Sequence, residues 1–216
     1  MAQTAKRRTR PTRVNGNLTR EKILDAAEAL FGERGYASVS LRDITNGADV
    51  TLALATYHFG TKENLFEEVV ARRADILCRA REERLAALAS PDIRAILDAF
   101  MAPLFEKATS GEPGWSHYFR VLARLGEGDQ WLDLLVRHFD GTANAFLDAL
   151  VGAMPKADRG EVARAFTMML QVMLATVSRH GRVDRLTRGS VRANDLQRAY
   201  PVLLQFVTAG MESFNR

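Results

Sequence analysis

The chain has 216 residues, enough to bury a sizeable core, and a formal net charge of +4. Its single cysteine, Cys78, excludes a disulfide framework within the chain and is typical of a reducing compartment. No apolar run follows the charged N-terminus as a secretion signal requires, and the apolar stretch 166–177 is too short to cross a bilayer. We therefore expect an all-α cytoplasmic protein with no membrane partner, made of one small and one larger domain.

Positive charge is concentrated at the start of the chain. The first 22 residues contain seven Lys and Arg side chains against one acid, Glu21, so the remainder is mildly acidic. Such a charge distribution is typical of a protein that meets phosphate at one end, although a solubilising tail has the same composition. We expect residues 1–17 to form a basic flexible arm.

The stretch from Thr19 to Phe66 predicts a bundle of three helices and the beginning of a fourth. In the first helix Thr19 is the expected N-cap and Gly35 the expected C-terminal residue, with an apolar stripe formed by Ile23, Leu24, Ala27, Leu30 and Phe31. A capping box, Ser40 to Asp43, starts a second helix that reaches about Asn46 before the turn residues Gly47 and Asp49. The third helix, capped by Thr51, runs from Leu52 to Phe59 and is closed by Gly60. The expected core contacts are Leu41, Ile44, Ala48, Val50, Tyr57 and Phe59.

Two short helices joined by a tight turn and braced by a longer one form a helix-turn-helix, which reads DNA. The stretch resembles the TetR family of bacterial transcriptional regulators. The matching residues are Thr19-Arg20, Ile23-Leu24, Ala26-Ala27, Leu30-Phe31, Gly35-Tyr36, Ser40, Ile44, Ala48, Val50, Tyr57-His58-Phe59 and Lys62-Glu63-Asn64-Leu65. The resemblance implies an all-helical homodimer on a palindromic operator in double-stranded DNA. It also implies a C-terminal domain, here 65–216, that binds a small molecule and thereby weakens DNA binding; residues 18–64 form the DNA-binding domain.

The resemblance assigns DNA contacts by position. Arg42 matches a residue that reaches a base edge, where its fork suits guanine. Thr51, Leu52 and Ala53 occupy the base-facing start of the recognition helix, while Tyr57, His58 and Lys62 match positions that touch phosphate or brace the helix. Thr56 stands where many members have a contacting tyrosine.

The recognition helix itself offers few hydrogen-bonding side chains. Leu52, Ala53 and Leu54 can at most touch thymine methyl groups, and we expect Leu54 to face the domain core. We therefore expect Arg42 to make the main direct base contact. The arm arginines would enter flanking minor grooves; these are Arg7, Arg8, Arg10 and Arg13.

Beyond Phe66 the pattern predicts six further helices, for a total of about nine. Their expected ranges are 62–89, 91–108, 115–125, 130–154, 161–180 and 194–214, with a loop at 110–114 and a polar link at 181–193. The last two helices carry an apolar seam that we expect to form a four-helix dimer interface, plain intrachain core being the alternative. The seam residues are Val162, Phe166, Met169, Leu170, Met173, Val177, Leu196, Leu203, Phe206, Val207 and Met211.

Met and aromatic residues on these helices predict a cavity for a lipophilic effector, although most of them should simply pack in the core. The candidate ligand-binding residues are Phe100, Phe105, Trp115, His117, Tyr118, Arg120, Arg124, Trp131, His138, Met169 and Met173. Arg120, His117, Arg124 and His138 are the polar groups expected to orient a carboxylate or carbonyl. The segment 119–125 and the end of the recognition helix resemble a branch of the family that includes fatty-acid-responsive members, which favours a fatty acid, an acyl thioester or another lipophilic effector.

Other chemistries lack their motifs. The four histidines and Cys78 show no metal-ligand spacing, and no phosphate-binding loop, nucleophile elbow or zinc-protease motif occurs. We expect no catalytic residue, metal or cofactor. The alternatives to a ligand-responsive repressor are an architectural DNA-binding protein without an effector and a helical small-molecule enzyme.

Overall fold

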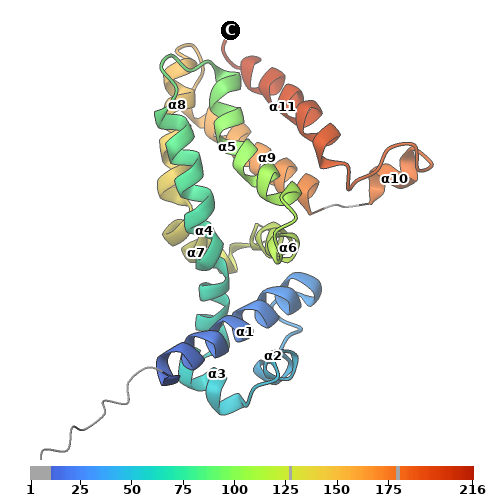
Figure 1. Ribbon diagram of the computed structural model, residues 1–216. Helices are drawn as coiled ribbons and strands as arrows, with labels where there is room; N and C mark the ends of the chain where they lie inside the picture. Colours follow the sequence, from blue (N-terminus) through green and yellow to red (C-terminus); the bar gives the residue numbers. More distant parts are fainter. Residues whose placement is uncertain (1–10, 127, 179–180) are drawn as a thin grey trace, which may run out of the picture. The chain divides into compact units, whose positions relative to one another are not determined.

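The computed structural model describes residues 11–126, 128–178 and 181–216, with side chains from residue 16 onward. Within these ranges the chain forms eleven α-helices and one 3-10 turn, and no strand (Figure 1). The all-α prediction is confirmed, with two helices more than expected. The helices group into two compact units, Met1–Val69 and Val70–Arg216.

The first unit contains α1 (Pro11–Arg34), α2 (Leu41–Ala48), α3 (Leu52–Phe59) and the start of α4 (Lys62–Ala86). The expected start of α1 at Thr19 is wrong, because Thr19 lies inside the helix, which extends over the described residues from Pro11. The expected end is confirmed, since Gly35 has φ +80° and its N–H donates to the carbonyl of Phe31 at 2.9 Å.

Local chemistry defines α2 and the turn after it. The Ser40 Oγ accepts from the Asp43 N–H at 3.2 Å, and the Asp43 carboxylate accepts from the Ser40 N–H at 2.8 Å. This capping box is as predicted. Asp49 ends the helix with φ +53°, the left-handed conformation that the turn requires. The bounds of α3 are also as predicted, although the Thr51 side chain makes no capping hydrogen bond.

Two expected core residues of the first unit lie on its surface. Tyr57 is 82% exposed and Leu54 is 40% exposed, so placing them in the core was wrong. Ala55 and Phe59, one turn apart, are the buried residues of α3, and this register turns Leu54 and Tyr57 outward. The unit is closed by an aromatic cluster, in which the ring of Phe66 lies 5.1 Å from that of Phe31 and 5.0 Å from that of Tyr36.

The second unit continues α4 and adds α5 (Ile93–Thr109), α6 (Trp115–Leu125), α7 (Leu132–His138), α8 (Asp140–Ala153), α9 (Arg159–Val177), α10 (Arg182–Leu186) and α11 (Leu196–Glu212). A 3-10 turn, Asp129–Trp131, precedes α7. Helix α11 packs on α5 and α9, while α6 and α8 pack on other parts of α9 and α5 (Figure 1).

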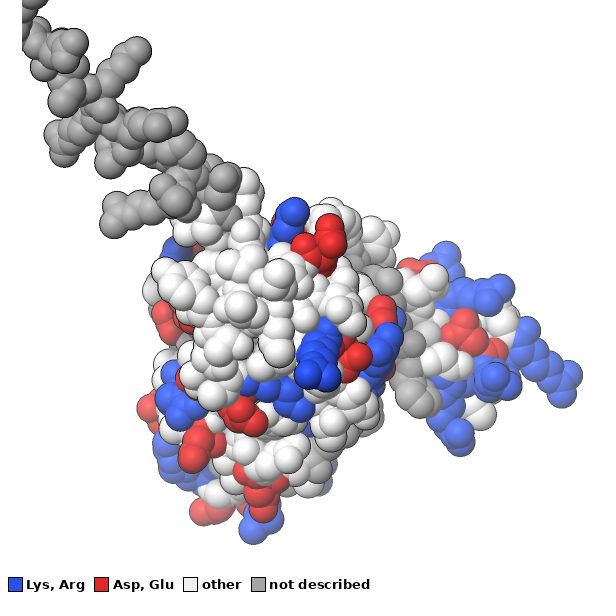
Figure 2. All heavy atoms as spheres, turned by 90° about the horizontal axis from the view of Figure 1, so that it is seen from below, with Lys and Arg blue, Asp and Glu red and all other residues white. Residues whose placement is uncertain are grey.

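The two additional helices arise at particular residues. The helix expected over 130–154 is broken at Phe139, whose φ of −130° departs from helical geometry. The polar link after α9 contains α10, and Figure 2 shows Lys and Arg side chains gathered on this projecting segment. None of the described helices combines the length and apolar character that a membrane crossing requires.

Candidate nucleic-acid interface and ligand site

The side chains expected to meet DNA form an exposed surface on α2 and α3. Arg42 on α2 is exposed, as are Thr51, Leu52, Ala53 and Thr56 at and after the start of α3. The two helices pack against each other, so these residues belong to one rigid helix-turn-helix. The guanidinium of Arg42 can donate hydrogen bonds to base edges. The apolar side chains at the start of α3 beside it can contact thymine methyl groups.

The C-terminal half of α3 adds aromatic groups. Tyr57 projects into solvent and meets the half-buried His58 edge-on, with ring centres 5.2 Å apart. A hydroxyl on an exposed ring can donate to a phosphate oxygen, which is a contact that positions a protein without reading sequence. The exposure of Tyr57 therefore fits the expected DNA contact and not the expected core role.

Lys62 acts as an internal brace. Its Nζ donates to the carbonyls of Tyr36 and Val39 at 3.0 and 2.9 Å, and lies 4.0 Å from the centre of the Tyr36 ring. The Tyr36 hydroxyl in turn donates to Glu63 at 2.6 Å; burial and this bond raise the pKa of Tyr36, while the same bond lowers the pKa of Glu63. In the structure Lys62 braces the loop between α1 and α2, and its expected contact with phosphate, or its bracing of the recognition helix against the DNA, stays a prediction.

Most of the basic arm lies outside the described residues. Arg7, Arg8 and Arg10 lie outside the described residues, and the side chain of Arg13 does too, although its backbone belongs to α1. Their minor-groove contacts remain a prediction.

The expected ligand-binding residues are spread over three packed clusters of the second unit. Trp115, Tyr118 and Phe119 of α6 are buried against one another, with ring centres 5.5–6.3 Å apart. Phe100 packs on Phe146 and Phe166, and Phe105 packs on Tyr200 at 4.7 Å. Met169 and Met173 are buried in α9. The remaining candidates lie nearer the surface: Arg120 is exposed, and His117, Arg124, Trp131 and His138 are half-buried.

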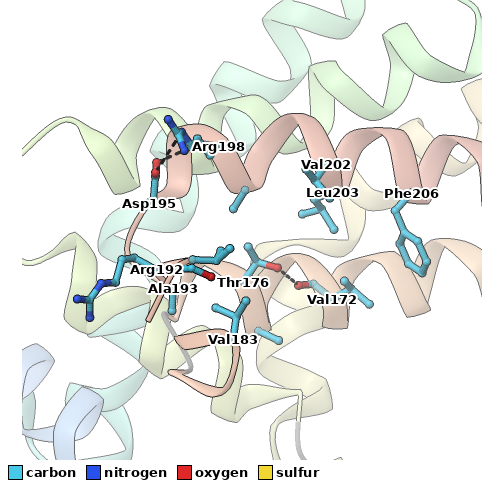
Figure 3. Close-up of a pocket in the computed structure, with 14 residues that line it drawn as sticks. Val172, Thr176, Val183, Arg192, Ala193, Asp195, Arg198, Val202, Leu203 and Phe206 are labelled. Atoms are coloured by element: carbon cyan, nitrogen blue, oxygen red, sulfur yellow. Dashed lines mark hydrogen bonds and ion pairs between the residues drawn. The ribbon is translucent and has the colours of Figure 1, made fainter. Parts of the chain in front are cut away.

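A cavity of about 760 Å³ lies elsewhere, between α9, α11 and the segment around α10. None of the expected ligand-binding residues lines it. Figure 3 shows Val202, Leu203 and Phe206 of α11 across from Val172 and Thr176 of α9, with an Asp195–Arg198 ion pair of 3.6 Å near one end.

Most of the expected dimer seam is intrachain core. Val162, Phe166, Met169, Met173 and Val177 are at most 4% exposed in α9. Leu196, Leu203, Val207 and Met211 are likewise buried in α11, so only Phe206 of the expected set is a large exposed residue. The large exposed apolar side chains of the two helices are instead Met168, Val172, Val202 and Phe206, which are 38–68% exposed; the last three also line the mouth of the cavity between α9 and α11.

One buried cation was not anticipated. Arg81 of α4 is only 4% exposed, and its Nε donates to the carbonyl of Phe100 at 2.9 Å. The sequence pattern could have predicted this burial. Val70, Ala74 and Leu77 form an apolar stripe at helical spacing, and Arg81 occupies the next position of that stripe. Within the described ranges no group of His, Cys, Asp and Glu could hold a metal ion.

Known proteins resemble both units. The chain is 32% identical over 87 residues to the HTH-type transcriptional repressor KstR2 of Rhodococcus jostii, a match covering 40% of this chain and 42% of the relative. It is 40% identical over 60 residues to the HTH-type transcriptional regulator AcrR of Shigella flexneri, covering 28% of each. The chain thus spans less than half the length of these curated relatives.

Solved structures share the fold over most of the chain. A TetR-family regulator from Bordetella parapertussis superimposes with a TM-score of 0.63 at 19% identity, over 87% of this chain and 93% of that one. The ketosteroid transcriptional regulator KstR2 of Mycobacterium tuberculosis gives a TM-score of 0.59 at 20% identity, over 88% and 93%.

Family models match both parts. Residues 23–69 match the model of bacterial regulatory proteins of the tetR family, and residues 98–210 match the tetracyclin repressor-like C-terminal domain. The second match alone covers more than half of the chain. The chain belongs to the TetR family of bacterial regulatory proteins.

Proposed function

We propose that this protein is a transcriptional repressor that binds a palindromic operator as a homodimer and leaves it when a small lipophilic effector binds the second unit. The observation that carries the proposal is the exposed surface of α2 and α3, where Arg42 lies beside the apolar start of the recognition helix. Only two short helices make up this surface. Operator affinity therefore requires a second copy on the neighbouring half-site.

The second copy has a candidate contact face. Met168 and Val172 of α9 and Val202 and Phe206 of α11 are large apolar side chains turned to solvent. Apolar side chains that gather on two neighbouring helices mark an interaction surface, and a twofold pairing of two such helix pairs buries both faces. This face supports homodimerisation through α9 and α11.

The effector is proposed to be lipophilic because the interior of the second unit is rich in aromatic and Met side chains. Phe100, Phe146, Phe166, Trp115 and Tyr118 are almost fully buried there. The relative KstR2 is described as a ketosteroid regulator, and a structural neighbour from Bacillus halodurans as a fatty acid degradation regulator. These descriptions belong to those proteins, and they support the same effector class for this one.

The test is footprinting of the full-length protein on the DNA upstream of its own gene. Fatty acids, acyl thioesters and steroids are then added in turn. We expect a protected palindrome that one of these compounds abolishes, and Arg42→Ala should lose the protection at the same protein concentration. Uniform protection without a palindrome would identify an architectural protein, and turnover of an added compound would identify an enzyme.

A further inference from the structure

Arg81 occupies a core position of α4. The preceding members of its helical stripe, Ala74 and Leu77, are at most 1% exposed, and Arg81 itself is 4% exposed. Arginine is almost never buried to this extent unless it is paired. Some interaction must therefore offset the cost of burying this charge.

Among the described residues, the Arg81 side chain contacts a backbone carbonyl and an aromatic ring, and the thiol of Cys78 and the hydroxyl of Tyr118 lie close enough to favour its charge. Besides the bond from Nε to the Phe100 carbonyl, the guanidinium carbon lies 3.9 Å from the centre of the Phe100 ring. No carboxylate in the part of the chain that the structure describes forms an ion pair with it. Arg84, three residues further on α4, has such a partner, because its Nη2 donates to both oxygens of Glu106 at 2.6 and 2.8 Å.

Arg81 nevertheless stays charged. Burial lowers its pKa to about 10, which leaves the guanidinium protonated at neutral pH. A buried charge without a counter-ion is costly, and a leucine at this position would continue the apolar stripe at no such cost. The guanidinium is thus a largely buried donor fork that has no carboxylate partner among the residues that the structure describes.

We propose that Arg81 is the counter-ion of the effector, and that the effector is an amphipathic acid whose carboxylate pairs with this guanidinium. The inference rests on the proposed function, because it gives the chemical class of the ligand that the second unit senses. A carboxylate accepts two parallel hydrogen bonds from the arginine fork, which makes the contact strong and directional.

The surroundings of Arg81 define the rest of the ligand. The Phe100 ring under the guanidinium contacts the rings of Phe146 and Phe166, with centres 5.0 and 5.1 Å away. These rings come from α5, α8 and α9, and all three are buried. The apolar body of the acid enters between them, so that binding separates helices that pack closely without the ligand. A neutral lipid has no partner for the cation and binds more weakly.

The first experiment uses the wild-type, full-length protein. Isothermal titration compares a panel of acids (decanoate, palmitate and cholate) with the primary alcohol corresponding to each. At least one acid should bind about 10- to 100-fold more tightly than its alcohol, the ratio expected for hydrogen bonds to charged groups. If every alcohol binds as tightly as its acid, or if no acid binds, the proposal is overturned.

The second experiment assigns the preference to Arg81. Arg81→Met should reduce the affinity for the acid to that for the alcohol, while the affinity for the alcohol stays unchanged. Arg81→Lys, which keeps the charge and loses the fork, should retain part of the preference. Arg84→Met is the matched control on the same helix and should bind as the wild type does. An Arg81→Met protein that folds and still prefers the acid contradicts the assignment. If that variant does not fold, the acid-to-alcohol affinity ratio of Arg81→Lys is compared with that of the wild type, and an unchanged ratio contradicts the assignment.

DNA binding separates this inference from the proposed function. Arg81→Met should bind the operator as the wild type does and stay bound when the acid is added. If the wild type binds the acid through Arg81 but binds no specific DNA, the proposed function fails and the ligand assignment stands. If neutral lipids release the operator and acids do not, the function stands and the ligand assignment fails.

Discussion

The ammonium group of Lys62, the first residue of α4, donates to the backbone carbonyl of Tyr36 and lies over the same residue's ring. A second bond to the carbonyl of Val39 joins α4 to both ends of the loop between α1 and α2. One side chain thereby satisfies two carbonyls that lie outside helices. The loop that orients the helix-turn-helix depends on it.

Lys62→Met should destabilise the first unit, because two carbonyls lose a charged donor. We expect a loss of about 1–3 kcal/mol in the free energy of unfolding of this unit. Amide hydrogen exchange of residues 35–40 in the full-length protein measures it, and these amides should exchange faster in the variant. Lys22→Met removes an exposed lysine of α1 and should leave the exchange unchanged. Equal exchange in Lys62→Met and wild type would show that Lys62 is no brace.

Asp49 should be intolerant of a β-branched replacement. Its φ of +53° is left-handed, and Val at this position should cost about 1–2 kcal/mol whereas Asn should be nearly neutral. The free energies of unfolding of the two variants are compared by chemical denaturation. Amide hydrogen exchange of α2 and α3 is a second measurement of the same difference. The prediction is wrong if Val and Asn are tolerated equally.

The capping box should make the start of α2 sensitive to acid. Hydrogen bonds from Ser40 hold the pKa of Asp43 below its ordinary value of 3.8, so the folded state favours the ionised carboxylate. The stabilisation is therefore fully present above that value and is lost as the pH falls through the lower, folded pKa. Exchange protection in α2 should fall below about pH 4 in the wild type. In Asp43→Ala protection should be lower at neutral pH and should lack this step; an identical acid step in the variant would refute the assignment.

Arg42→Ala should weaken operator binding without unfolding the protein, since Arg42 is exposed on α2. A bidentate contact to guanine contributes about 1–3 kcal/mol of discrimination, so the variant should also tolerate substitution of one operator base pair. Fluorescence anisotropy with wild-type and substituted operators measures both effects. A uniform loss on every DNA sequence would instead assign Arg42 to phosphate.

Phe206→Glu should convert a homodimer into monomers, because it places like charges at a face that is apolar in the wild type. Analytical ultracentrifugation at micromolar concentration gives the mass. Gln197→Glu is the matched control, because Gln197 is also exposed but lies on the opposite side of α11 from Phe206 by helical spacing. A dimer that persists in Phe206→Glu would exclude α11 from the interface.

The DNA-reading unit is the part most readily predicted from sequence. The capping box at Ser40, the left-handed Asp49 and the glycines at 35 and 60 act within a few residues of themselves, and each lies where expected. The Thr19 cap was wrong because a threonine that suits a helix start is also tolerated in a helix interior, and the preceding described residues continue the helix. The break at Phe139 was not foreseen, because the weak points of the run 130–154 are its glycines at 141 and 152, and Phe139 itself is no helix breaker.

The helical fold, the helix-turn-helix and the family could be predicted without coordinates, since they depend on residue spacing and on contacts between near neighbours in the chain. Which side of each helix is buried depends instead on how the helices pack in the folded protein. This packing turned Leu54 and Tyr57 outward, placed the expected seam residue Met169 in the core, and left Met168 and Phe206 in solvent. It also brought Arg81 and Phe100, nineteen residues apart, into contact. Periodicity shows that a helix has an apolar stripe, but packing decides how wide that stripe is and which residue at its edge becomes buried.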